Sequence, residues 1–317
     1  MKKLILLLFL TVVIVVAKVK NWVYEPGRLE KPVQTVVSKG ATVAGIALQL
    51  KEAGVIEKPW LFRLAARWYR LDTSIKAGEY EFTPHISMFD AIEKMARGEV
   101  LYRKITVPEG LTTRQILDII EADDNLRGEI TLQPDEGELL PETYSFVYGD
   151  TKDSIIRQAQ EAMKKAVAEA WERRAEGLPV KNSAELLVLA SIVEKETGIA
   201  EERGLVASVF VNRLRKGMRL QTDPTVIYAL TSGRADLERA LTRKDLEVDS
   251  PYNTYKYYGL PPKPICNPGL ASLLAAANPE MSDYLYFVAS GDGGHNFAAS
   301  LNDHNKNVSL WKKKRKP

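Results

Sequence analysis

The chain has 317 residues, of which 45% are hydrophobic and 27% charged, a composition that argues against disorder and predicts two or three domains. Its formal net charge is only +3, and no basic stripe with interleaved aromatic residues runs through its body, which argues against nucleic acid as a partner. A single cysteine, Cys266, excludes an intramolecular disulfide and a cysteine-based zinc cluster.

The first 24 residues have the pattern of a secretion signal or a membrane anchor. Two lysines precede a run without charges over residues 4–17. This run fits a signal-peptide core and is short of the roughly twenty residues that a membrane span needs. Flanking lysines can snorkel, and Trp22 with Tyr24 suits a headgroup layer, so the usable helix is longer. We therefore expect an uncleaved anchor over residues 1–24, in preference to cleavage after Ala17, with the body outside the cytoplasm.

A local pattern occurs twice after a linker at residues 25–31. The segment TVVSKGATVAGIALQL at 35–50 can be laid over ITVPEGLTTRQILDII at 105–120. Each copy predicts a short β-branched strand, a glycine turn, a threonine N-cap and an amphipathic helix. Between the copies, residues 77–83 alternate like a strand, and residues 87–96 predict a helix that ends at a glycine.

These strand and helix units resemble LysM modules, which bind glycans through a strand-helix-helix-strand element. The resemblance implies that this region contacts glycan. The alternative is that the units serve packing only, because the repeat itself carries no aromatic platform for sugar rings.

Further helices and a hairpin are expected in the second half of the chain. The predicted elements are a long helix over 154–176, a buried helix that begins near Ser183, a helix over 201–216, a short helix from Asp223-Pro224, and a hairpin formed by 284–290 and 295–299. The glycines between the hairpin strands are typical of a turn, and no lysine follows them as in a phosphate-binding loop.

The most informative stretch lies at residues 186–262, where acids, amides and tyrosines interrupt apolar segments. It contains LLVLASIVEKETG, NRLRKGMRLQTDPTVIY and YNTYKYYGLPP. Together these segments resemble the endolytic murein transglycosylases, or YceG-like proteins, and the likeness extends over nearly the whole chain. One motif departs from the family pattern, since Glu142 stands where the family has aspartate, and we therefore assign Glu142 no role in the chemistry.

The resemblance implies an activity, a substrate and a location. The activity is that of an endolytic peptidoglycan lytic transglycosylase, which cuts the β-1,4 bond between N-acetylmuramic acid and N-acetylglucosamine in nascent glycan strands and leaves 1,6-anhydro ends. The implied partners are peptidoglycan glycan strands, the cytoplasmic membrane through a single N-terminal helix, and peptidoglycan synthases beside which the enzyme acts in wall assembly.

Glu196 is the expected catalytic acid and base. Cleaving a glycosidic bond needs a carboxyl group that is still protonated near neutral pH. Glu196 shares a helix face with apolar residues and lies in the last turn, where the helix dipole disfavours a carboxylate; both effects raise its pKa. Glu194 points about 160° away around the helix axis. The resemblance also assigns catalysis to the second glutamate of VEKET, which is Glu196.

Two loops offer side chains for sugar hydroxyl and N-acetyl groups. The candidate substrate-binding residues are Gln221, Thr222 and Asp223 in the first loop and Asn253, Thr254 and Tyr255 in the second. Asp223 before proline is also a common helix N-cap, and we weigh capping as the larger part of its role. The candidate supporting residues are Glu194, Arg213 and Tyr228.

Other chemistries find little support in the sequence. Three dispersed histidines do not suggest a metal site, and motifs for a serine nucleophile or a nucleotide are missing, so we expect neither a metal nor a cofactor. Two alternatives stay open: a muramidase that uses Glu196 with Asp223 or Glu194 as second carboxylate, and a peptidoglycan-binding scaffold without activity.

The expected fold class is α+β. We expect an N-terminal membrane helix at 1–24, a linker at 25–31, a LysM-like strand-helix region at 32–125, and a C-terminal mixed α/β catalytic domain at 126–317. The catalytic domain is expected to be built around the buried helix that carries Glu196.

Overall fold

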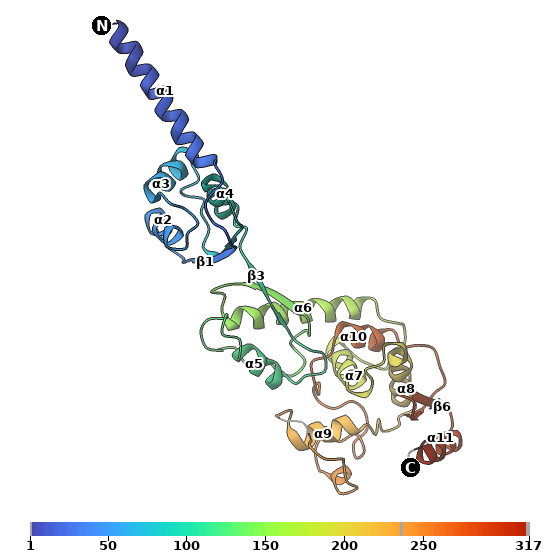
Figure 1. Ribbon diagram of the computed structural model, residues 1–317. Coiled ribbons are helices and arrows are strands. Elements are labelled where there is room, and N and C mark those ends of the chain that lie inside the picture. The colour runs from blue at the N-terminus through green and yellow to red at the C-terminus, as the bar shows by residue number, and fades with distance from the viewer. Residues whose placement is uncertain (1, 235–236, 315–317) are drawn as a thin grey trace. The chain divides into compact units, whose positions relative to one another are not determined.

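The computed structural model of the chain describes residues 2–234 and 237–314. It is a mixed α/β structure of helices and two-stranded sheets, which confirms the expected combination of elements (Figure 1). The chain divides into two compact units. The first holds the residues up to Arg103 together with Ser145–Asp150, and the second holds Lys104–Tyr144 and the chain from Thr151 onwards. The predicted functional division between residues 125 and 126 stays a prediction.

The first unit packs three helices with a two-stranded sheet and also includes the N-terminal helix. Its elements are α1 (Lys2–Tyr24), β1 (Val33–Val37), α2 (Val43–Glu52), α3 (Pro59–Trp68), β2 (Gly78–Phe82) and α4 (Met88–Arg97). Strands β1 and β2 pair antiparallel, with Val33 opposite Phe82, and α2 and α3 lie between them in the chain. This is the strand-helix-helix-strand order expected for a LysM-like element. The core includes Phe62, Tyr80 and Phe82, all fully buried.

None of the helices in the described part of the chain combines the length and the apolar character needed to cross a membrane. The expected membrane-spanning helix is therefore unsupported. Residues 2–24 do form one continuous helix, α1.

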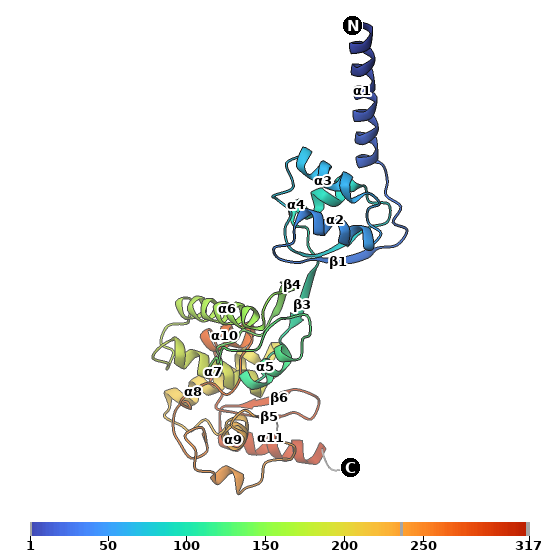
Figure 2. The same ribbon diagram turned by 90° about the vertical axis from the view of Figure 1, so that its left-hand side faces the viewer.

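The second unit is mainly helical. Strands β3 (Tyr102–Thr106) and β4 (Thr143–Val147) each have residues in both units. The other elements of the second unit are α5 (Thr113–Glu121), α6 (Lys152–Glu172), α7 (Ser183–Glu196), the 3₁₀ turn η1 (Ala200–Glu202), α8 (Arg203–Arg215), α9 (Asp223–Thr231), the 3₁₀ turn η2 (Asp245–Glu247), α10 (Leu270–Ala277), β5 (Tyr286–Ala289), β6 (His295–Ala298) and α11 (Leu301–Lys314). Strands β3 and β4 pair with each other, and the chain passes between the units along them. Strands β5 and β6 form the predicted hairpin, seen beside α11 in Figure 2.

Both copies of the sequence repeat fold as predicted. Thr42 and Thr112 are the N-caps of α2 and α5, and each side chain accepts a hydrogen bond from the backbone N–H three residues on. Gly40 and Gly110 have φ angles of +82° and +73°, which glycine adopts without strain. The two copies belong to different compact units, because β1 pairs with β2 whereas β3 pairs with β4.

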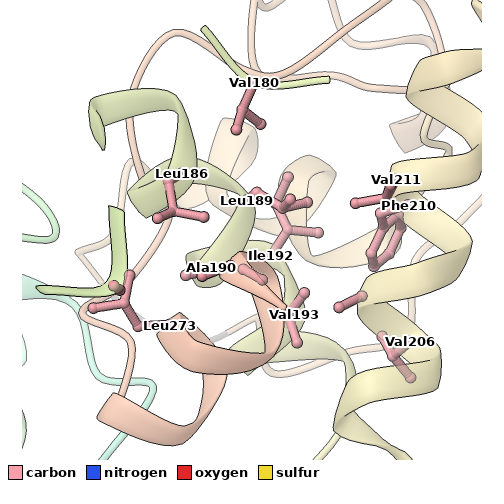
Figure 3. Packing of buried hydrophobic residues seen from close by; sticks show 14 of the residues in the cluster. Val180, Leu186, Leu189, Ala190, Ile192, Val193, Val206, Phe210, Val211 and Leu273 are labelled. Carbon is pink, nitrogen blue, oxygen red and sulfur yellow. The ribbon is translucent and has the colours of Figure 1, made fainter. Parts of the chain in front are cut away.

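Helix α7 is the centre of the second unit. Its side chains from Val188 to Val193 are all buried, so the helix is enclosed almost all round, as the sequence predicted. Figure 3 shows Leu189 and Ile192 of α7 packed toward Phe210 of α8, with Leu273 of α10 close to α7. Burial at this level fixes the axis of α7 firmly, and with it the position of its last residue.

Candidate active site

Glu196 is the last residue of α7. The helix ends there because Thr197 adopts an extended conformation and its N–H bonds back to the Val193 carbonyl. The carboxyl group of Glu196 is partly buried and lines a cavity of about 200 Å³. A helix packed in the core of the unit therefore ends in an acid that lines the cavity.

The pKa of Glu196 is raised to about 7. Burial is the main cause, since it removes water from around the carboxylate. The nearby negative charge of Asp223 raises this pKa further, whereas a hydrogen bond from Thr222 and the electrostatic interactions with His295 and Arg213 lower it. With these effects combined, Glu196 can hold its proton close to neutral pH, where an ordinary glutamate has lost it.

Thr222 is the direct partner of Glu196. Its hydroxyl donates a hydrogen bond to Oε1 of Glu196, and its own N–H donates to Oγ1 of Thr254 at 3.1 Å. Because Oε1 accepts from Thr222, we assign the proton of the neutral carboxyl to Oε2. The preceding residue, Gln221, has a φ angle of +52°, a strained backbone that turns the loop into the cavity.

Asp223 does not cap helix α9, so the expected capping role is wrong. Thr222 occupies the cap position, and Asp223 is the first helical residue, followed by Pro224. The carboxylate of Asp223 instead accepts a 2.6 Å hydrogen bond from the hydroxyl of Tyr255. Both residues line the same cavity as Glu196.

Arg213 of α8 forms another wall of this cavity. Its guanidinium group is buried and donates to the carbonyls of Leu285 at 2.6 Å and Leu220 at 2.8 Å. Burial lowers the pKa of Arg213. These bonds hold the guanidinium in place, so that Arg213 adds a positive charge to the wall of the cavity that Glu196 and Asp223 also line; its supporting role in the reaction stays a prediction.

Asn253 and Thr254 are fully buried and organise the second loop. Nδ2 of Asn253 donates to the carbonyls of Leu246 at 3.0 Å and Val248 at 2.8 Å, and its Oδ1 accepts from the N–H of Tyr255. Oγ1 of Thr254 lies 2.8 Å from that of Thr225. Neither residue lines the cavity, so binding of substrate by these two side chains stays a prediction.

Glu194 and Tyr228 lie away from the cavity. Oε2 of Glu194 accepts a 3.0 Å hydrogen bond from the N–H of Gly269, the residue before α10. The hydroxyl of Tyr228 donates to Glu136 at 3.3 Å, and burial raises the pKa of Glu136. The separation of Glu194 from Glu196 agrees with their positions on opposite sides of α7.

Four residues near the acid were not predicted from the sequence. Phe210, Leu220 and Phe287 line the cavity, and the ring of His295 stands edge-on to that of Phe287 at 5.3 Å between centroids. Nδ1 of His295 lies 2.6 Å from a carboxylate oxygen of Glu202. The β5–β6 hairpin, about ninety residues after Glu196 in the chain, brings Phe287 and His295 here; the sequence predicted this hairpin but not its position beside Glu196.

Among residues 2–234 and 237–314, no three or more His, Cys, Asp or Glu side chains lie close enough together to hold a metal ion. Cys266 is buried, and its thiol donates to the carbonyl of Ser191 at 3.4 Å.

The polar groups that line the cavity are two carboxyls, a guanidinium, an amide and a phenol, and they lie among apolar rings. This set suits proton transfer to a neutral polar ligand.

The chain is similar to known proteins over most of its length. The model of the YceG-like family matches residues 35–310. The endolytic murein transglycosylase of Bacillus subtilis (strain 168) is 34% identical over 313 residues, which cover 88% of this chain and 85% of that protein. The endolytic murein transglycosylase of Streptococcus pneumoniae (strain D39) is 30% identical over 327 residues, covering 88% of this chain and 58% of that protein.

A solved structure shows the same likeness. The crystal structure of a YceG-like protein from Listeria monocytogenes has a TM-score of 0.55 and 34% sequence identity with this chain. The match covers 87% of this chain and 98% of that one.

Proposed function

Because this chain belongs to the YceG-like family, we propose that it is an endolytic peptidoglycan lytic transglycosylase with Glu196 as its catalytic acid and base. The observation that carries the assignment of the residue is the Glu196 carboxyl itself. It lines a cavity at the end of a buried helix, and its pKa is about 7. A group with this pKa can give up a proton and take one back at neutral pH.

The proposed reaction needs one residue in two roles. Glu196 donates the proton on Oε2 to the oxygen that joins C1 of N-acetylmuramic acid to C4 of N-acetylglucosamine, and the C1–O bond breaks. The 6-hydroxyl oxygen of the same muramic acid forms a bond to C1, and the Glu196 carboxylate takes the hydroxyl proton. The product is a 1,6-anhydro end, no water is consumed, and the nucleophile is already held in place within the substrate.

The neighbours of Glu196 assist this cycle by position and charge. Thr222 fixes the carboxyl group so that one defined oxygen carries the proton. Asp223, held by Tyr255, places a negative charge near the positive charge that develops at C1. The cavity is smaller than the roughly 300–1,000 Å³ of drug-binding sites, so it fits one sugar-sized portion of a longer strand.

We propose that the enzyme works on the extracytoplasmic side of the cytoplasmic membrane, where murein lies, and that α1 attaches it there. Two observations support the attachment. Residues 4–17 carry no charge, and several large apolar side chains of α1 are exposed, among them Leu7, Phe9 and Val13. Glycan binding by the LysM-like region and action beside peptidoglycan synthases belong to the same proposal.

A muramidase is the second candidate, because Asp223 lines the same cavity as Glu196. A hydrolase of this class needs a second carboxylate as nucleophile or as the base for a water molecule. Asp223 is exposed and close enough to raise the pKa of Glu196. Glu194 is not available for this role, since it bonds to the N–H of Gly269 outside the cavity.

Mass spectrometry of digested peptidoglycan tests both candidates. We expect wild type to release fragments with anhydro ends, which lack one water relative to reducing ends. Glu196→Gln should release none, because the amide has no acidic proton, whereas the control Glu194→Gln should remain active because an amide oxygen can still accept from Gly269. Reducing ends would establish the muramidase, and an active Glu196→Gln variant would refute the assignment of this residue. If wild type released no fragments, the protein would instead be a peptidoglycan-binding scaffold without activity.

A further inference from the structure

Helix α3 exposes an apolar stripe on the surface of the first unit. Trp60, Leu64 and Trp68 are spaced by four residues, which places them along one side of the helix. Their exposed fractions are 54%, 45% and 73%. The opposite side of α3 is buried in the core through Phe62 and Ala66. The stripe is therefore not the packing face of α3, and two largely exposed indole rings on one helix indicate a binding surface.

Positive charges flank this stripe. Arg63 and Arg67 lie on the same outer side of α3 by helical spacing, and both are exposed. Neither forms an ion pair with any residue that the structure describes, and the helix itself contains no acidic residue. Lys58, immediately before the helix, adds a third cation. Two cations available for pairing beside exposed indoles complement an anionic surface.

The stripe is also adjacent to the apolar N-terminal helix. Nζ of Lys58, at the start of α3, lies 3.7 Å from the ring centroid of Trp22 in α1. Figures 1 and 2 show α3 at the end of the first unit from which α1 leaves, whereas β1 lies at the other end. The exposed side chains of α1 and the α3 stripe thus belong to one end of the unit.

We propose that the outer face of α3 binds the surface of an anionic phospholipid bilayer. Trp60 and Trp68 lie at the depth of the headgroups, Leu64 reaches the acyl boundary, and Arg63 and Arg67 pair with lipid phosphates. A bilayer fits better than a glycan, because sugar rings would stack on the indoles without a use for the exposed leucine. The proposal rests on the membrane location proposed above and adds a lateral contact, which would fix how the first unit is held at the membrane.

A fluorescent probe on α3 tests the contact in the full-length chain. Cys266 is fully buried, so Leu64→Cys provides one accessible thiol for an environment-sensitive label. The labelled protein is mixed with vesicles of phosphatidylcholine and phosphatidylglycerol that carry a shallow nitroxide-labelled lipid, and the vesicle-bound fraction is isolated by flotation. We expect a blue shift and loss of emission from the probe. Both effects should weaken with phosphatidylcholine alone, in high salt, and in the Arg63→Gln/Arg67→Gln variant.

The matched control is Ser38→Cys, an exposed position in the turn after β1, which should keep its emission. A Leu64 probe in vesicle-bound protein that remains as water-exposed as the Ser38 probe would overturn the proposal, as would failure of the protein to float. Protection of the Leu64 probe by soluble murein fragments, without any effect of vesicles, would identify a glycan surface instead. Release of murein fragments is measured on the same samples and does not depend on the probe. A failure of the proposed bilayer contact can therefore be distinguished from a failure of the proposed transglycosylase activity.

Discussion

At the scale of single residues, the acidity of Glu196 is set by opposing neighbours. Burial and the charge of Asp223 raise the pKa of this carboxyl, and the hydrogen bond from Thr222 lowers it. The result of about 7 lies where one group can act as acid and then as base. If burial acted alone, the pKa of Glu196 would be higher and the carboxyl would be a weaker acid in the first step.

This balance predicts the pH dependence of strand cleavage. The acid form of Glu196 is required, so kcat/KM should fall about tenfold per pH unit as pH rises above about 7. Asp223→Asn removes a negative charge that raises the Glu196 pKa, so this variant should lose activity at a lower pH than wild type. The measurement is initial-rate kinetics on soluble strands from pH 5 to pH 9, a range of about four units around the pKa. If the alkaline decrease in kcat/KM moved to higher pH in Asp223→Asn, Asp223 would not raise the pKa of Glu196 as inferred here.

The sequence predicted Glu196 but not its partner. A 3.6-residue period places Glu196 beside apolar side chains, and its place in the last turn is also local information. The bond from Thr222 depends on the turn at Gln221 and on Thr254 of the second loop, which is a tertiary contact. The same reason explains why capping by Asp223 was expected: the local Asp-Pro pattern cannot show that Tyr255 takes the carboxylate.

At the scale of elements, the loop before α9 depends on the loop that follows η2. The N–H of Gln221 donates to the carbonyl of Thr254 at 3.2 Å, and Thr225 links back to Thr254. The side chain of Asn253 stabilises the second loop by donating to the backbone carbonyls of Leu246 and Val248. The second loop therefore holds the first in the position that directs Thr222 toward Glu196.

Asn253→Ala should show which role this residue has. Loss of three hydrogen bonds in a buried loop predicts a decrease of roughly 2–4 kcal/mol in the free energy of unfolding. Activity should fall as well, because Tyr255 and Thr254 lose their support. Denaturant unfolding and steady-state kinetics check both effects, with the exposed neighbour Tyr258→Phe as control. Unchanged stability with a raised KM would instead favour the predicted contact between Asn253 and substrate.

At the scale of the whole molecule, the two units have separate cores. The buried cluster around Phe62 and Phe82 contains only residues of the first unit, and the cluster around α7 only residues of the second. The number of domains was within the range predicted from composition. The sequence could not show that the two copies of the repeat belong to different units. Both copies have the same local signals, and they differ only in the strand with which each one pairs.

Separate cores predict separate unfolding transitions. Phe62→Ala removes a fully buried ring from the first unit and should destabilise that unit by about 3–5 kcal/mol. Leu273→Ala, its counterpart in α10, should destabilise the second unit by about 2–5 kcal/mol. Differential scanning calorimetry of the full-length chain should then show two transitions, each lowered by one variant only.

Activity on soluble strands completes this test, because Glu196 and its neighbours all belong to the second unit. Phe62→Ala should keep its rate at temperatures where the first unit has unfolded but the second has not. A single transition that moves in both variants would contradict the prediction, since it would show that the two cores unfold as one cooperative system. In that case the packing of the first unit would contribute to the geometry around Glu196.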